Sequence, residues 1–454
     1  MGTEKIRKLM LQFAIPAVVS HLVNASYNLI DQVLIGNSVG MLGIAATNVA
    51  FPLTPISAAV GYLLGTGGAA NFSLRLGENE KEAANRYACN TLGTLTLTGA
   101  AIMTAVLLFA GPLVMAFGST VTVKPLALTY TKIIAVGIPF SIFTIGSNAL
   151  IRADGSPRYA MVCTLVGAAF NLIGDPIAVF VFGWGIAGVA WMTTISQILT
   201  AGISVFYFLK KAKSITVKRE QLWPKLQLTL KTCALGLTPC INQLGVTALQ
   251  ITLNNVMRHY GALSAFGSDI PLSSVGAVSK LDVLFMSFTT GIAQGCQPIL
   301  GFNYGAKRYD RVKKTMRLAI TTASLISAAA FLVIQIFPRS LMLIFGESDP
   351  LYLEFAVRFL RIFMFMTFVR GLQPVAAIFF PSIGKATRGL WIALSRQVIF
   401  IIPLLLVLPL FFGLSGAVYA GPLADFAAAC VSSTLIVREI RNMTAMQKAQ
   451  ASMS

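Results

Sequence analysis

Two aspartates inside apolar stretches are the residues best placed to do chemistry in this chain. Asp31 lies in the first apolar run, and Asp175 lies in the fifth, four residues after Asn171. Carboxylates that share a low-dielectric site are poorly solvated and repel each other, which favours uptake of a proton or a cation. The sequence therefore predicts an ion-coupling site near these acids, and it leaves the choice between H⁺ and Na⁺ open.

A stripe of polar side chains leads up to Asp31, and a second stripe repeats it in the other half of the chain. Steps of three and four residues place each stripe on one helical face. An offset of 223 relates the stripes and matches Asp31 with Asn254. We expect both to face a shared, wet substrate cavity, with hydrogen bonding between helices as the alternative. The stripes are Ser20, Asn24, Tyr27, Asn28 and Asp31, and Gln243, Thr247, Gln250 and Asn254.

The amino-acid composition indicates that membrane-spanning helices position these polar residues. Of 454 residues, 56% are apolar and 11% are charged, and the mean hydropathy is +0.76. A soluble protein cannot hide so much apolar surface, so we expect an all-α polytopic membrane protein that lies in the lipid bilayer. Twelve stretches are long enough to span it: 10–35, 45–72, 88–113, 128–151, 159–182, 186–209, 232–257, 275–302, 316–337, 355–380, 389–412 and 414–437.

The distribution of basic residues predicts the orientation. The net charge is +19, and lysines and arginines gather in every second loop, most densely between Lys210 and Lys231. Basic loops of multi-pass proteins lie on the cytoplasmic side. We therefore expect both termini to be cytoplasmic in a cell membrane, and we attribute the charge to topology instead of nucleic-acid binding.

The two halves of the chain form a weak internal repeat. Pro16 matches Pro239, and Gly77 matches Gly305. Six helices in each half make the repeat parallel, with an axis along the membrane normal. This pattern favours a transporter, with a channel or scaffold as the alternative. The predicted division is 1–209 for the first six-helix bundle, 210–230 for a basic cytoplasmic linker and 231–454 for the second bundle and a short tail.

Motifs for other functions are missing from the sequence. There is no G-x-x-x-x-G-K-[ST] segment to bind a nucleotide. The six cysteines form no CxxC pair, and there are only two histidines. We expect no enzyme activity, no cofactor and no metal beyond a coupling Na⁺.

Four segments resemble the multidrug and toxic compound extrusion (MATE) family along the whole chain. They are YNLIDQVLIG in the first span, IRADGSPRYAM after the fourth, NLIGDP in the fifth and QPILGFNYGAKRYDRVKK after the eighth. The resemblance implies a V of two six-helix lobes that opens alternately to each side. It also implies a secondary antiporter that exports organic, often cationic and amphipathic drugs or toxins in exchange for H⁺ or Na⁺.

The same resemblance implies roles for individual residues in coupling. Positions that match the family's N-lobe cation or proton site are Asp31, Tyr27, Asn171, Asp175 and Thr193, or Thr194 if the register is shifted by one. Pro16 matches a helix 1 proline at which bending accompanies coupling. The acidic C-lobe site of some family branches is missing here, because the second stripe carries amides. This departure favours coupling in the N-terminal lobe.

Two alternative functions stay open at this point. A flippase for lipid-linked saccharides has a related architecture and requires a cationic cavity, to which Arg370 and Arg396 could contribute. A channel or receptor is the other alternative, and in it the buried acids could be neutralised without loss of coupled flux. The sequence assigns no role to the remaining charges within or beside apolar stretches, namely Lys280, Asp282, Arg370, Arg396 and Asp425.

Overall fold

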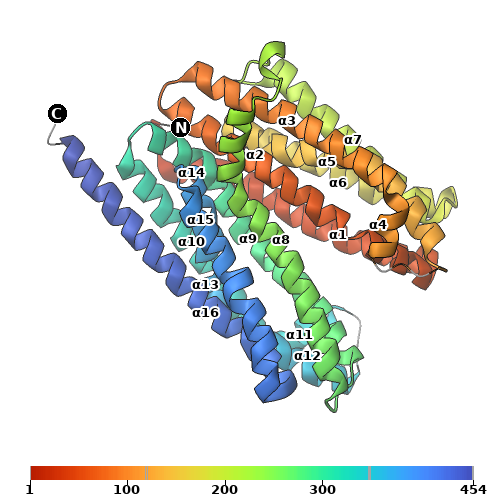
Figure 1. The fold of residues 1–454 in the computed structure, drawn as a ribbon. Helices are drawn as coiled ribbons and strands as arrows, with labels where there is room; N and C mark the ends of the chain where they lie inside the picture. Colours follow the sequence, from red (N-terminus) through yellow and green to blue (C-terminus); the bar gives the residue numbers. More distant parts are fainter. Residues whose placement is uncertain (1, 118, 120, 346–348, 452–454) are drawn as a thin grey trace.

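The computed structural model describes the backbone of residues 2–117, 119, 121–345 and 349–451, and the side chains of these residues except 27–45 and 451. All regular structure in this part is helical (Figure 1). The helices are α1 (Ile6–Ala50), α2 (Leu53–Gly77), α3 (Lys81–Leu108), α4 (Ala110–Ala116), α5 (Lys124–Ala153), α6 (Pro157–Pro176), η1 (Ile177–Val181), α7 (Gly185–Phe206), η2 (Tyr207–Lys211), η3 (Arg219–Gln221), α8 (Leu226–Ala262), α9 (Asp269–Gly305), α10 (Tyr309–Ile336), α11 (Pro338–Leu343), α12 (Pro350–Phe363), α13 (Thr367–Arg370), α14 (Leu372–Ser382), α15 (Ala386–Leu394), η4 (Ser395–Ile401) and α16 (Ile402–Ala451).

Helical structure follows from the apolar composition, because a helix satisfies its backbone hydrogen bonds internally. Nine helical stretches of the described residues are long and apolar enough to cross a bilayer, and the bent pair α12 and α13–α14 makes ten. The more polar α8 is not among them. The stretch Ala386–Gln450 holds two helices, because Gly413 breaks α16 with φ 57° and ψ −142°. With α8 and this second helix, each of the twelve predicted spans has a helical counterpart, and the all-α membrane fold is confirmed.

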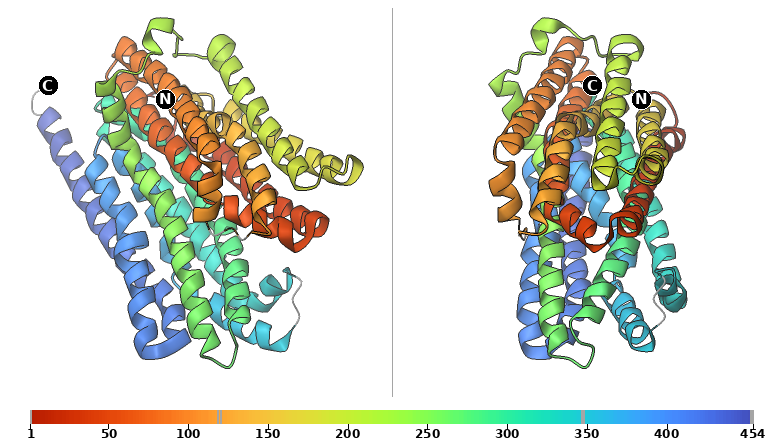
Figure 2. Two further views of the ribbon diagram at one scale, coloured as in Figure 1. Left: turned by 45° about the vertical axis from the view of Figure 1, so that its right-hand side comes forward. Right: turned by 90° about the vertical axis from the view of Figure 1, so that its right-hand side faces the viewer.

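The two halves of the chain meet at one end and diverge at the other (Figures 1 and 2). Both termini lie at the end where the halves meet. There α2 packs along α8 and α1 packs along α9. The halves diverge at the opposite end, which gives the predicted V of two lobes.

Glycines permit the close approach of the lobes. A Cβ atom on Gly236 of α8 would overlap the carbonyl oxygen of Leu63 in α2, and one on Gly67 of α2 would overlap that of Thr232 in α8. Any larger residue would push the helix backbones apart. We call the packed faces of α2 and α8 around these two glycines the glycine seam.

The linker between the lobes is fastened to the first lobe. The carboxylate of Asp154 accepts hydrogen bonds from the backbone N–H groups of Lys213 and Ser214, each at 2.7 Å, and from the hydroxyl of Tyr207 at 2.6 Å. Asn85 of α3 bonds both the N–H and the carbonyl oxygen of Thr216, at 2.7 and 2.8 Å. The linker is therefore an ordered layer over one end of the first lobe. The predicted residue limits of the lobes stay a prediction.

Candidate functional site

Asn171, Asp175 and Thr193 form a buried polar cluster in the first lobe. The Nδ2 atom of Asn171 donates to Oδ1 of Asp175 and to Oγ1 of Thr193, each at 3.3 Å. Asn171 is 4% exposed and Asp175 is 1% exposed. A carboxylate this deep in an apolar bundle is costly to keep charged, so a protein that retains one commonly uses it.

Local sequence explains how the cluster is held. Asn171 and Asp175 are one helical turn apart on α6, and Thr193 comes from the adjacent α7. The hydroxyl of Ser196 in α7 donates to the carbonyl oxygen of Gly167 in α6 at 2.7 Å and fixes their contact. Immediately after Asp175, Pro176 lacks an N–H group, and the chain continues as the π-helix η1.

The structure separates the two threonines that the sequence left as alternatives. Thr193 contacts the Asn171 amide, whereas Thr194 is fully buried and donates to the carbonyl oxygen of Ile133 in α5 at 3.1 Å. Thr193 therefore belongs to the cluster, and Thr194 joins α7 to α5.

Three predicted site residues lie outside the described side chains: Tyr27, Asn28 and Asp31. Two others on the same helix are described. Pro16 lies inside α1, where Ser20 donates to its carbonyl oxygen at 2.8 Å, and the side chain of Asn24 is exposed. No group of three or more His, Cys, Asp or Glu side chains that could hold a metal ion occurs among the described residues.

A central cavity of about 290 Å³ lies between the lobes. The first lobe contributes His21, Tyr62 and Thr66, and the second lobe contributes most of the rest. Polar groups alternate with apolar ones on its walls, as in sites that accept organic molecules. Its second-lobe lining consists of Thr238, Pro239, Asn242, Gln243, Val246, Asp282, Val283, Met286, Ser287, Thr290, Gln294, Arg370, Gln373, Pro374, Ala377, Ile378, Ala393, Arg396 and Gln397.

The predicted stripe on α8 divides between the cavity and the helix interface. Gln243 lines the cavity, and Thr247 donates to the Gln243 carbonyl oxygen at 3.2 Å. Further along α8, Gln250 donates to Asn254 at 3.0 Å and accepts from Ser279 of α9, also at 3.0 Å. The cavity lining includes Gln243 but not Thr247, Gln250, Asn254 or Asn24.

Sequence reasoning missed a network of four charged side chains beside this cavity. Arg370 makes a bidentate pair with Asp282, at 2.6 and 2.9 Å, and its Nε lies 3.5 Å from Asp425. Asp425 also accepts from Nε of Arg396 at 2.6 Å. Two arginines thus face two aspartates. The network as a whole therefore carries no net charge, which weakens the support for the flippase alternative.

Polar contacts also join the two lobes beside the cavity. Nη2 of Arg152 in the first lobe donates to Oε1 of Gln294 in the second at 3.1 Å. The amide of Gln297 donates to the carbonyl oxygen of Thr66 at 3.0 Å. Together with the glycine seam, these contacts join the two lobes on the side of the termini.

The comparisons with known proteins agree with this architecture. The family model described as MatE matches residues 16–177 and 240–407. The chain is 22% identical over 437 residues to the multidrug export protein MepA of Staphylococcus aureus (strain MRSA252), covering 96% of this chain and 94% of that protein. It superposes with a TM-score of 0.91 and 20% identity on a structure of MATE in complex with MaL6, over 97% of this chain and 98% of that one. A structure described as the outward-facing conformation of a multidrug resistance MATE family transporter gives a TM-score of 0.90 at 20% identity, over 97% of both chains.

Proposed function

We propose that this chain, which belongs to the MatE family of multi-pass membrane transporters, is a secondary antiporter that exports organic drugs or toxins in exchange for H⁺ or Na⁺. The observation that carries the proposal is the buried cluster of Asn171, Asp175 and Thr193. The substrates we infer are amphipathic and often cationic. The names of its relatives, which include multidrug export proteins, support the export of drugs and say nothing of the chemical class of substrate.

The coupling step in this proposal is neutralisation of the first-lobe acids. A proton or a sodium ion binds Asp175, together with Asp31 of α1, and removes the cost of a buried negative charge. The Asn171 and Thr193 side chains supply the polar surroundings that keep the carboxylate available. Neutralisation permits α1 to bend near Pro16, where the proline already removes one backbone hydrogen bond.

Export requires that the ion and the drug favour different conformations. An ion that binds one conformation better shifts the equilibrium toward it and weakens drug binding there, and the drug weakens ion binding by the same factor. With the termini in the cytoplasm, as the basic loops predict, the conformation described here opens outward. It is then the conformation in which an incoming cation displaces the drug.

Dye efflux from proteoliposomes tests this function. Ethidium-loaded vesicles containing the protein are given an inward pH gradient and, separately, an inward sodium gradient. We expect efflux under one of the two gradients, which identifies the coupling ion, and loss of that efflux in Asp31→Asn. If neither gradient moves the dye, drug export by ion coupling is refuted. If Asp31→Asn pumps as well as the parent protein, Asp31 does not couple.

A further inference from the structure

A second pocket lies on the first lobe, away from the central cavity, and shares no lining residue with it. It has a volume of about 510 Å³, within the ~300–1,000 Å³ typical of small-molecule sites. Residues from α3, α5, α7 and η2 form its walls, and the linker forms its roof. The pocket is lined by Leu92, Gly93, Thr96, Leu97, Phe143, Val205, Phe208, Leu209, Val217, Arg219, Leu222 and Trp223.

The walls of this pocket are apolar and face the surroundings of the bundle. Leu97 is 47% exposed, and Leu209 is 64% exposed. The one hydroxyl among the wall residues, that of Thr96, donates to the carbonyl oxygen of Leu92 at 3.0 Å. The walls therefore offer surface for hydrocarbon and no further hydrogen-bonding side chain.

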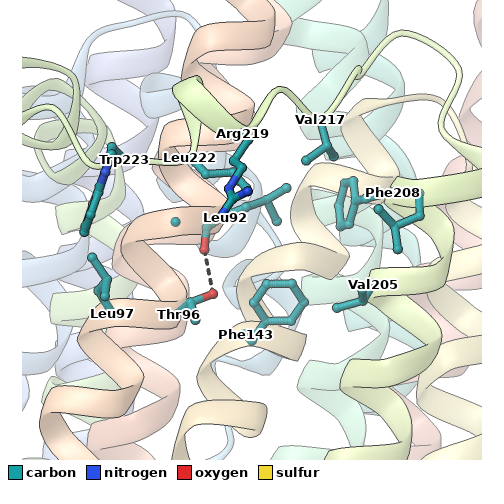
Figure 3. Close-up of a pocket in the computed structure, with 12 residues that line it drawn as sticks. Leu92, Thr96, Leu97, Phe143, Val205, Phe208, Val217, Arg219, Leu222 and Trp223 are labelled. Atoms are coloured by element: carbon teal, nitrogen blue, oxygen red, sulfur yellow. Dashed lines mark hydrogen bonds between the residues drawn. The ribbon is translucent and has the colours of Figure 1, made fainter.

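The roof places a single cation over these walls. Figure 3 shows the Arg219 side chain descending from the linker between Leu222 and Leu92, with Phe143 and Val205 below it. No ion pair or hydrogen bond from the Arg219 side chain occurs within the described part of the chain. An unpaired guanidinium above an apolar pocket can accept an anionic oxygen in a forked geometry.

Contacts between the linker and α3 fix the position of Arg219. It begins the short helix η3, whose other end is held because Asn85 donates to the side chain of Gln221 at 2.8 Å. A Cβ atom on Gly93 of α3 would overlap the carbonyl oxygen of Leu222, so the linker backbone lies directly on α3. The side chain of Asn90 in α3 accepts a hydrogen bond from the backbone N–H of Lys225 at 2.6 Å, which holds the end of the linker that precedes α8.

The surroundings of the pocket match the headgroup region of a bilayer. Trp223, in the linker between η3 and α8, is 73% exposed, and tryptophan side chains are enriched at the membrane–water interface. Exposed lysines flank it in the same linker, at positions 210, 211, 213 and 218. Clusters of basic residues beside membrane helices attract anionic lipids.

We propose that this pocket binds one anionic phospholipid, with its phosphate on Arg219 and its acyl chains against Leu97, Val205 and Phe208. The lipid belongs to the leaflet that contacts the linker. By filling the space between α3, α7 and the linker, it holds the linker on the first lobe. The proposal does not depend on which ion or drug the protein transports.

Native mass spectrometry of the purified full-length protein tests the lipid site. Phosphatidylglycerol and phosphatidylcholine are titrated separately, and the first bound lipid is quantified. We expect phosphatidylglycerol to bind at least ~10-fold more tightly, Arg219→Gln to abolish this preference, and Arg219→Lys to retain part of it. The matched control is Lys218→Gln, which removes a neighbouring charge that does not line the pocket and should retain the preference.

Two further measurements distinguish a bound lipid from a smaller anion in this pocket. Val205→Trp narrows the pocket and should weaken binding of both lipids, because their chains share its walls. Free glycerol phosphate at millimolar concentration should displace neither. Equal affinity for the two lipids, an unchanged preference in Arg219→Gln, an equal loss in Lys218→Gln, or displacement by glycerol phosphate would each overturn the proposal.

Discussion

The side-chain amide of Asn171 lies 3.3 Å from the carboxylate of Asp175, one turn further along α6, in a part of the first lobe that is almost closed to solvent. The same amide reaches Thr193 of α7 at 3.3 Å. One neutral side chain therefore joins the buried acid to a second helix. We therefore expect a change in the charge of Asp175 to alter the hydrogen bonds between α6 and α7.

Asp175→Asn removes the buried charge while it keeps the size of the side chain. We expect ion-driven efflux to fall at least ~100-fold, because the neutral amide can neither accept a proton nor supply the negative charge that a cation would neutralise. Efflux is measured in proteoliposomes under the driving gradient. Asp310→Asn, which changes an exposed acid at the start of α10, is the control and should transport normally. Efflux of Asp175→Asn within twofold of the parent protein would exclude Asp175 from coupling.

Thr193→Val and Thr194→Val distinguish a site residue from a structural neighbour. Thr193→Val removes a side-chain partner of Asn171 and should shift the ion concentration for half-maximal efflux by ~3- to 10-fold, the equivalent of about 1 kcal/mol. Thr194→Val should leave that concentration unchanged and lower thermal stability, because its hydroxyl bonds the Ile133 carbonyl oxygen. The reverse pattern would show that Thr194 is the coupling threonine.

Breaking the charged network of the second lobe should destabilise the protein. Asp425→Asn leaves Arg396 without its carboxylate partner, and loss of one member of a buried pair costs about 3–5 kcal/mol. Thermal unfolding in detergent measures the loss, with the exposed Glu354→Gln as a control. The double variant Asp425→Asn/Arg396→Gln should be more stable than the sum of the single changes predicts. Full additivity would mean that the pair is not coupled.

Gly236→Ala tests the glycine seam between the lobes. The added methyl group overlaps the Leu63 carbonyl oxygen and should disfavour the closed seam by about 1 kcal/mol or more, a ~5-fold change in population. Cys233, one turn away in α8, is a native thiol that packs against the first lobe. Its labelling by a maleimide, read by peptide mass spectrometry, should rise accordingly. Gly276→Ala, where a Cβ atom meets nothing within 4 Å, should label like the parent protein. Equal labelling of both variants would contradict a role for the seam.

Much of the architecture follows from the sequence because membrane helices obey simple rules. Apolar runs predict the spans, and basic loops support their alternation. The match of Pro16 with Pro239 predicts two related lobes. The i, i+4 spacing of Asn171 and Asp175 places both on one face of α6, as the structure has them. Asp31, their expected partner in α1, remains a prediction because its side chain lies outside the described residues.

Other parts of the site depend on contacts between distant helices, which spacing along the chain does not reveal. Arg370 and Asp282 are 88 positions apart and come from α13 and α9. The one available signal was that charges of both signs lay in or beside apolar stretches, where a buried charge requires a partner. Similarly, the sequence around Asp154 does not predict its partners. The structure shows that the linker lies over this residue, and two backbone N–H groups of the linker donate to its carboxylate.

Reciprocal flux tests the central claim most directly, because an antiporter must move its ion when its drug gradient is the only driving force. Proteoliposomes with entrapped pH and sodium indicators receive an ethidium gradient and no ion gradient. The account predicts that H⁺ or Na⁺ crosses in the direction opposite to the dye, and that Asp175→Asn abolishes this ion movement. Dye movement without any ion flux, or the same ion flux in Asp175→Asn, would contradict coupling by the first-lobe cluster.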